Sequence, residues 1–219
     1  MHRFLIFSIA CLLLANSGFS QSDKYIQAMQ SRLKSMDELK DPAELKDLSA
    51  AFERIGDAEK DKWQPYYYAA LSMAIGGYNL SNVTTDNKAA AIDPFADKAE
   101  MLLNKAMALS PDNSELFVLR KMINTLKMTA DPMNRYMQLM GPSAEALATA
   151  KKLNPDNPRI YLLEGQDKFF TPEQFGGSKA EAKKLFELAL QKYEAFKPEN
   201  ELSPKWGKEL AESLLAQIQ

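Results

Sequence analysis

The stretch AMALSPDN at residues 106–113 is repeated, with changes, as AKKLNPDN at residues 150–157. Both copies end on Pro-Asp-Asn, and each contains the same spacing of small and large apolar side chains. The matching positions are Ala99, Leu103, Ala106 and Pro111 in the first copy, and Ser143, Leu147, Ala150 and Pro155 in the second. Self-similarity of this kind is the sequence signature of a repeat architecture. The chain is therefore predicted to contain stacked copies of one small unit.

Helix-forming residues dominate the rest of the chain. Valine occurs only at Val83 and Val118, whereas Ala, Leu, Met, Glu, Lys and Gln are abundant. Prolines that follow a capping side chain predict helix starts at Asp41-Pro42, Asp93-Pro94, Asp131-Pro132, Thr171-Pro172 and Ser203-Pro204. Together with apolar residues at steps of three and four, these signals predict an all-α chain of about eight or nine helices.

The repeated frame resembles the second half of a tetratricopeptide repeat (TPR). In that family two small residues flanking a large apolar one let antiparallel helices pack closely before a proline ends the unit. Two weaker copies, which lack the proline, fall in phase: Leu48, Phe52 and Ile55, and Ala182, Phe186 and Ala189. The resemblance covers roughly residues 42–196. It implies TPR-like antiparallel helix pairs stacked as a short right-handed solenoid.

The resemblance extends to the first helix of each unit. Two copies carry the family's aromatic and small residues there, Tyr66 with Ala70 and Tyr161 with Gly165. In the middle copy Phe117 holds the aromatic place, but Lys121 stands where a small residue is expected. The frames begin at residues 48, 99, 143 and 182, more widely spaced than the family's about 34 residues. Inserted loops are therefore expected at 76–92, around 129–140 and at 170–177.

The resemblance also implies a binding surface. In TPR proteins, positions five, nine and twelve of each first helix face the concave side. These positions hold Tyr67, Leu71 and Ala74, then Val118, Met122 and Thr125, then Leu162, Gln166 and Phe169. None is charged, so we expect a largely apolar groove that does not capture a terminal carboxylate. In the alternative, the helix after Pro204, which carries Leu210, Leu214 and Leu215, folds back and fills the groove as a cap.

Two groups of apolar side chains have more than one interpretation. A dense methionine tract, which includes Met122, Met133, Met137 and Met140, is explained most simply by adaptable core packing, although such surfaces also suit promiscuous binding. We expect two of the three residues Tyr66-Tyr67-Tyr68 to pack in the core while at least one faces outward. We expect Phe169, Phe170 and Phe175 to be mostly buried.

The N-terminus has the pattern of a signal peptide. Arg3 precedes an apolar run over residues 4–15, and Gly18 and Ser20 stand at the −3 and −1 positions of a cut before Gln21. We predict a signal peptide at 1–20, a single TPR-like domain with a C-terminal capping helix at 21–219, and a periplasmic or secreted bacterial protein. A lipid anchor on Cys11 is the alternative, disfavoured because the three residues before it make a poor lipobox.

Composition excludes several classes of function. The chain is 46% apolar and 26% charged, with a net charge of −2, as in an ordinary soluble domain. Removing the leader removes His2 and Cys11, the only histidine and cysteine, and with them His- or Cys-based nucleophile systems, disulfides and the usual zinc sites. We predict no cofactor and no metal. The chain has no run of basic residues for nucleic acid and no apolar stretch long enough for a transmembrane span.

The sequence favours a binding or scaffold module rather than an enzyme. Its groove would serve a protein or peptide partner, or a lipophilic small molecule. The alternative is a carboxylate-dependent hydrolase with its site at the inserted loops, using Asp86, Asp93, Asp131 or Glu173. No pair among these four has a spacing that fixes a common site.

Overall fold

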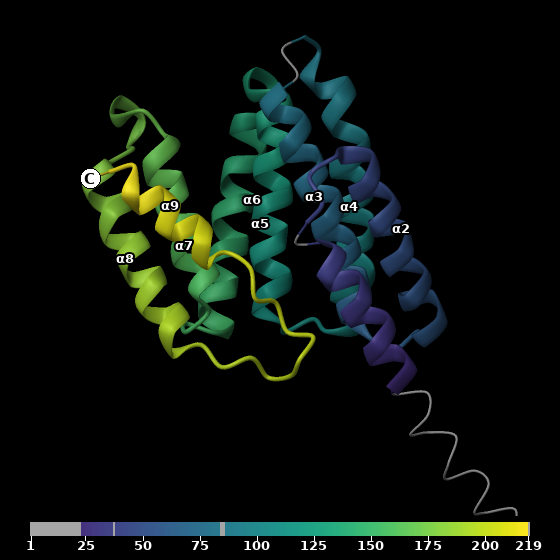
Figure 1. Cartoon of the computed structure of the whole chain (residues 1–219). Helices are drawn as coiled ribbons and strands as arrows, with labels where there is room; N and C mark the ends of the chain where they lie inside the picture. Colours follow the sequence, from purple (N-terminus) through teal and green to yellow (C-terminus); the bar gives the residue numbers. More distant parts are fainter. Residues whose placement is uncertain (1–22, 37, 84–85, 219) are drawn as a thin grey trace, which may run out of the picture.

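The computed structural model describes residues 23–36, 38–83 and 86–218 (Figure 1). These residues form helices, turns and loops without a strand, which confirms the all-α prediction. The predicted leader and its cut before Gln21 lie outside the described residues. None of the described helices is both long and apolar enough to cross a membrane.

The helices stack as antiparallel neighbours. A helical segment at 23–36 precedes α2 (Pro42–Glu59), α3 (Trp63–Val83), α4 (Lys88–Leu109), α5 (Ser114–Ala130), α6 (Pro132–Leu153), α7 (Pro158–Phe170), the 3-10 turn η1 (Glu173–Phe175), α8 (Lys179–Ala195) and α9 (Lys208–Ala216). The main packed pairs are α2 with α3, α3 with α4, α5 with α6, and α7 with α8. Short connections join the consecutive helices from α3 to α8. As a result α3, α5 and α7 run in one direction, and α4, α6 and α8 run in the opposite direction (Figure 1).

Two of the five predicted helix starts are confirmed. Pro42 and Pro132 open α2 and α6, where the side chains of the preceding aspartates accept backbone N–H groups. Pro94 instead lies inside α4, because Asn87 caps that helix six residues upstream of the predicted cap, Asp93. Pro172 precedes only η1, and Pro204 stands ahead of α9, which begins at Lys208. A capping residue before proline is compatible with a helix start at that position, but it does not determine that a helix begins there.

The expected inserted loops are mostly helix. Residues 76–83 and 88–92 extend α3 and α4, and residues 132–140 form the first turns of α6. Alanine at 89–91 and methionine at 133, 137 and 140 favour helix, whereas residues 76–83 contain neither and are helical despite two glycines. Close packing also requires glycine in α3, because a Cβ on Gly77 would lie 2.6 Å from the Leu126 side chain. Only the segment 170–177 is largely an excursion between helices, as predicted.

The repeated frame marks the core. Ala99, Leu103 and Ala106 on α4, Ala150 on α6, and Ala182, Phe186 and Ala189 on α8 are all fully buried. Gly165 in α7 faces α8 so closely that a Cβ there would lie 2.5 Å from the Phe186 ring. The small residues of the frame therefore stand where neighbouring helices approach most closely.

Candidate functional site

The predicted groove positions divide into a buried and a half-buried set. Tyr67, Leu71, Ala74, Val118 and Leu162 are fully or almost fully buried. The half-buried positions are Met122, Thr125, Gln166 and Phe169. A side chain that solvent cannot reach does not line an open groove, so the groove predicted from the sequence is too long. The positions that solvent still reaches lie toward the C-terminal ends of α5 and α7.

The C-terminal segment covers the buried part. Trp206 donates a hydrogen bond from Nε1 to the hydroxyl of Tyr67 at 2.8 Å. Gly207 lies against Leu162, and Ala211 and Leu214 of α9 are buried in the same apolar cluster as Leu162. In Figure 1 this segment loops out from the end of α8 and returns as α9. The capping alternative thus describes this half of the predicted groove in part, since Leu214 is buried but Leu210, which it also expected to fill the groove, is 43% exposed.

A buried arginine holds the C-terminal segment against the start of α7. Arg159 at the start of α7 is fully buried and donates from Nη1 to Glu115 Oε1 of α5 at 3.0 Å. Its Nη2 donates to the carbonyl oxygen of Pro204. The guanidinium carbon lies 5.2 Å from the ring centres of both Phe196 and Trp206. Burial raises the pKa of Glu115 more strongly than the arginine beside it lowers that pKa.

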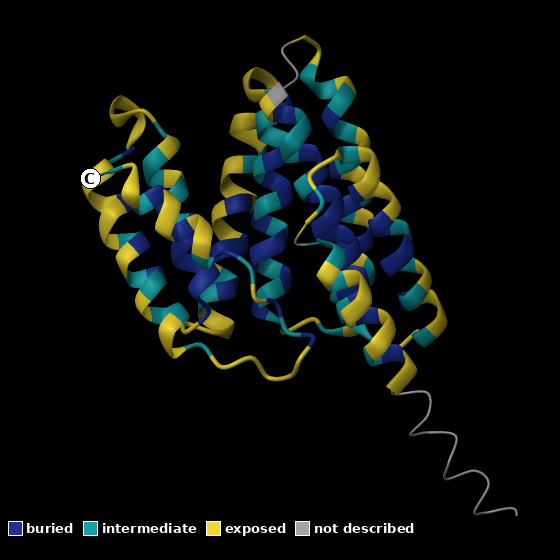
Figure 2. Cartoon of the chain, viewed as in Figure 1, coloured by how far each residue is buried: buried dark blue, intermediate teal, exposed yellow. Residues whose placement is uncertain are grey.

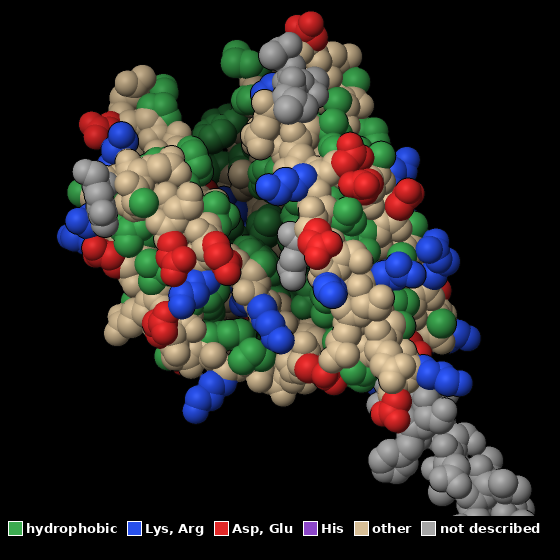
Figure 3. All heavy atoms as spheres, in the orientation of Figure 1, with side chains coloured by type: hydrophobic (Ala, Val, Ile, Leu, Met, Phe, Trp, Pro, Cys, Tyr) green, Lys and Arg blue, Asp and Glu red, His purple; other side chains and the backbone are tan. Residues whose placement is uncertain are grey.

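An open cleft remains between α6 and α7. The two helices share few contacts compared with α5 and α6, and in Figure 1 they diverge from the turn that joins them. Figure 2 shows exposed residues on the first turns of α6 and on the excursion after α7. In the space-filling view of Figure 3 the region between these elements is hollowed, with hydrophobic side chains on its walls.

An exposed apolar stripe on α6 forms one wall. Tyr136, Met140 and Leu147 follow one another at helical spacing and therefore share one side of α6. Leu147 is buried in the cluster that contains the apolar residues of α7, whereas Tyr136 and Met140 are 46% and 45% exposed. Met133 and Met137, which flank this side, are 92% and 80% exposed. One side of α6 is therefore apolar along its length. It is buried near Leu147 and exposed near Tyr136 and Met140.

Aromatic side chains from α7 form the facing wall. Phe170 lies two turns beyond Leu163, on the same side of α7; Leu163 is buried, but Phe170 is 66% exposed. Phe169 is half-buried and packs edge-on against Phe170, with ring centres 4.9 Å apart. Phe175 in η1 is 71% exposed. The expectation that these phenylalanines are mostly buried is therefore wrong, because α7 has parted from α6 at this level.

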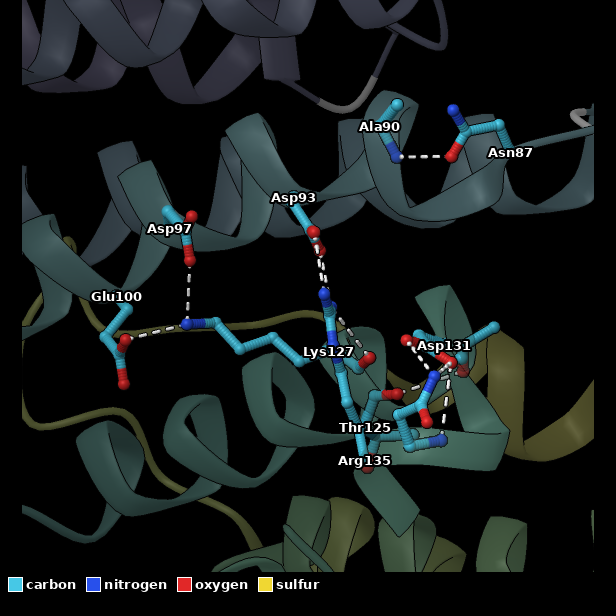
Figure 4. Close-up of polar contacts among 11 residues, drawn as sticks. Asn87, Ala90, Asp93, Asp97, Glu100, Thr125, Lys127, Asp131 and Arg135 are labelled. Atoms are coloured by element: carbon cyan, nitrogen blue, oxygen red, sulfur yellow. Dashed lines mark hydrogen bonds and ion pairs between the residues drawn. The ribbon is translucent and has the colours of Figure 1, made fainter. Parts of the chain in front are cut away.

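Ion pairs hold the exposed end of α6 in place (Figure 4). Arg135 of α6 forms a two-pronged pair with Asp93 of α4, with N–O distances of 2.5 and 2.8 Å. Lys127 of α5 lies 2.8 Å from both Asp97 and Glu100 of α4. The hydrogen bonds from Arg135 lower the pKa of the Asp93 carboxyl. The Arg135–Asp93 pair therefore holds the end of α6 that carries the exposed apolar stripe against α4.

A polar cluster lies between α3, α5 and α7 beside the open part of the groove. Lys121 is 5% exposed, and its Nζ lies 2.6 Å from Asp167 Oδ1 of α7 and 2.9 Å from Thr125 Oγ1. Tyr78 of α3 donates its hydroxyl to the Met122 carbonyl at 2.7 Å. Burial, and then the charge of Asp167, raise the pKa of Tyr78. In the sequence, Lys121 stands out only because a lysine occupies a repeat position where a small residue is expected. That mismatch is the sequence feature that could have identified this polar cluster.

Of the four carboxylates of the hydrolase alternative, Asp93 and Asp131 both lie near Arg135, and each already has a structural partner. Asp93 is paired with Arg135, and Asp131 caps the N-terminus of α6 by accepting from the Asn134 backbone. Glu173 belongs to η1, beyond the end of α7. Asp86 is an exposed residue before α4. Among the described residues there is also no group of three or more His, Cys, Asp or Glu that could hold a metal ion.

A second hollow, of about 900 Å³, lies where the chain turns between helix pairs. Its lining is mainly polar and charged and includes Asp112, Asn113, Asn154 and Lys192. The C-terminal segment supplies Phe196, Lys197 and Ser203. This lining suits an apolar ligand less well than the α6–α7 cleft does.

The three tyrosines of α3 differ from expectation. Tyr66, Tyr67 and Tyr68 are all buried, with exposures of 7%, 0% and 4%. Tyr66 donates to Asp57 at 2.8 Å, and Tyr68 donates to the Leu202 carbonyl at 2.9 Å. The outward-facing tyrosine is absent because α2 and the C-terminal segment cover α3 from different sides.

Comparison with known proteins gives one strong match. No protein-family model matches the chain, and a search of curated proteins found no match. Among solved structures, the chain is similar to the HusA haemophore from Porphyromonas gingivalis, with 31% sequence identity and a TM-score of 0.76. The match covers 89% of this chain and 92% of the haemophore chain. At that identity over nearly the whole of both proteins, the chain belongs to the same family of helical proteins as the HusA haemophore.

Proposed function

We propose that this chain is an exported binding module that carries haem or a closely related porphyrin. The ligand lies in the cleft bounded by α5, α6 and α7. The observation that carries this proposal is the uncovered apolar stripe on α6 opposite exposed Phe170, in a relative of a protein described as a haemophore. A large exposed apolar patch on a protein of this kind marks a binding surface.

The chemistry of the two walls suits a flat apolar ring. Thioether side chains such as Met137 and Met140 adapt to an irregular surface and make favourable contacts with aromatic systems. Phe170 offers an aromatic face on the other side. A porphyrin inserted between them would bury both of its faces, together with side chains that now meet water.

Binding would not use a histidine or cysteine ligand to the iron. Histidine and cysteine, common ligands of haem iron, occur only at His2 and Cys11, and the predicted cleavage removes both. Methionine and tyrosine can also ligate haem iron, and the α6 wall carries exposed Tyr136, Met137 and Met140, so comparing haem with the iron-free ring measures what the iron adds.

The finer features of the fold also belong to this proposal. We interpret the pairs α3–α4, α5–α6 and α7–α8 as degenerate TPR-like repeats in a short solenoid. The burial of Ala106 and Ala150, and the contact of Gly165 with Phe186, support this interpretation. The predicted signal peptide supports export.

The test is a titration of the purified protein, residues 21–219, with haem and with iron-free protoporphyrin IX. Binding is followed by the visible absorbance of the ring and by quenching of Trp63 and Trp206 fluorescence. We expect saturable binding of both compounds with one ligand per chain. Failure of both to bind at ten micromolar protein would contradict the proposal.

Paired variants locate the site. Met137→Glu and Phe170→Glu each place a charge on an exposed wall position, so folding should be preserved while binding weakens at least tenfold. Met101→Glu is the matched control, because Met101 is an exposed methionine, 42% accessible, on α4. Equal weakening by all three substitutions would place the ligand elsewhere.

A further inference from the structure

Lys121 is a buried cation held between α5 and α7, two of the helices that bound the cleft. Lys121 lies on the same side of α5 as Val118, Met122 and Thr125, the predicted groove positions of that helix. Its ammonium reaches across to Asp167 of α7, which is three residues before exposed Phe170. The charge is therefore held between the two helices at the level where the apolar walls begin to be exposed.

Most of the other nearby cations pair away from the cleft; the exception is Lys151 in the last turn of α6, which lies 2.9 Å from Glu164 of α7. Lys127 and Arg135 face the acidic residues of α4. Lys168 of α7 pairs with Glu181 of α8 at 2.7 Å. The ion pair of Lys121 with Asp167 joins α5 to α7. Among the described lysines and arginines of α5, α6 and the second half of α7, it is the one that does so.

The lysine retains capacity for another acceptor. An ammonium carries three N–H donors, and the described partners of Lys121 are two oxygens, one from Asp167 and one from Thr125. The Asp167 side chain is 52% exposed, whereas that of Lys121 is only 6% exposed. Asp167 is thus the solvent-facing member of the pair, and a second carboxylate that approaches from the cleft would meet it first.

We propose that Lys121 binds a carboxylate of the ligand, so that the cleft selects porphyrins with free carboxylate groups over their uncharged esters. This inference rests on the proposed function. In the empty cleft Asp167 neutralises the buried ammonium, and a ligand carboxylate takes the free donor or displaces Asp167 from it. The expectation that the groove does not capture a carboxylate came from the nine concave positions alone, and Lys121 is not among them.

The experiment compares protoporphyrin IX with its dimethyl ester on the same protein, in the same detergent-containing buffer. We expect Lys121→Met to weaken binding of the free acid about tenfold or more, since a charge-assisted hydrogen bond is lost. Binding of the ester should stay within about twofold of wild type. Lys168→Met, which removes a lysine paired with α8, is the matched control and should leave both affinities unchanged.

Asp167→Asn supplies the opposite test at an exposed position, where folding should tolerate the change. Removing the competing carboxylate should tighten binding of the free acid about threefold or more and leave the ester unaffected. This variant keeps the proposal testable even where Lys121→Met does not fold.

The outcomes separate this inference from the proposed function. If wild-type protein binds neither compound, both the proposed function and the role of Lys121 are wrong. If it binds acid and ester equally, or if Lys121→Met weakens both equally, the cleft binds the ring but Lys121 serves only to join α5 and α7.

Discussion

Trp206 and Tyr67 join the two ends of the molecule through one hydrogen bond, from the indole Nε1 to the phenol oxygen at 2.8 Å. Tyr67 is fully buried in α3, and Trp206 packs against the apolar clusters of both the N-terminal and the C-terminal helices. The C-terminal segment therefore packs against both the N-terminal and the C-terminal helices. This contact limits the candidate site to the cleft farther along α5, α6 and α7.

Tyr67→Phe should destabilise the fold by about 1–2 kcal/mol, because the indole N–H of Trp206 would lose its acceptor in a partly buried place. The free energy of unfolding in urea measures this loss. Tyr136→Phe is the control, since Tyr136 is 46% exposed, and it should change stability by less than about 0.5 kcal/mol. Equal values for the two variants would show that the bond has no net effect.

Deleting residues 203–219 should expose the core. The deletion removes Trp206, Ala211 and Leu214, and it leaves Arg159 without the Pro204 carbonyl. We expect strong binding of an apolar dye and either aggregation or loss of the cooperative unfolding transition. Lys205→Ala, an exposed substitution in the same segment, should behave as wild type. A truncated protein that unfolds cooperatively with unchanged stability would mean that the segment is not part of the core.

Ala150→Leu should overpack the crossing of α6 with its neighbours. Ala150 has no exposed surface, and its carbonyl accepts a hydrogen bond from Ser114 Oγ of α5 at 2.9 Å, so the two helices are close there. The expected loss is about 1–3 kcal/mol by thermal unfolding. Ala148→Leu on the exposed side of α6 is the matched control and should be nearly neutral. A loss below about 0.5 kcal/mol for Ala150→Leu would contradict the close-packing role.

Stability should depend on pH through Asp93. Arg135 lowers the pKa of Asp93 in the folded state, so this pair stabilises the protein fully above the carboxyl's ordinary pKa and loses that effect as the pH falls through the folded value. At pH 7 Asp93→Asn should cost about 1 kcal/mol, as for a two-pronged pair near the surface. The difference between wild type and variant should shrink by pH 3. A difference that grows on acidification would have the wrong sign.

Local sequence patterns predicted the helices well. The repeat frame marked residues that are buried, such as Ala106 and Phe186, because burial on one side of a helix imposes its own spacing. Helix boundaries were less predictable. Asp93-Pro94 reads as a start, yet Asn87 caps α4 earlier, and competing caps cannot be ranked from their residue types alone.

The site was predicted only in part, because its limits depend on contacts between distant segments. Tyr67 and Leu162 hold groove positions in the repeat, and nothing near them in sequence shows that Trp206 and Gly207 cover them. The exposure of Phe170 likewise follows from the divergence of α6 and α7. Lys121 was visible as an unusual residue, but its partner, Asp167, is known only from the fold.

Methionine methyl NMR tests the central claim most directly. The protein is labelled with ¹³C at the methionine methyl groups, resonances are assigned by single Met→Leu variants, and iron-free protoporphyrin IX is added. Because the ring current of a porphyrin shifts nearby nuclei strongly, we predict large shifts for Met137, Met140 and Met122, and none for buried Met29 or for Met101 on α4. Shifts at Met29 or Met101, with the α6 methionines unchanged at saturation, would contradict a porphyrin site in the α6–α7 cleft.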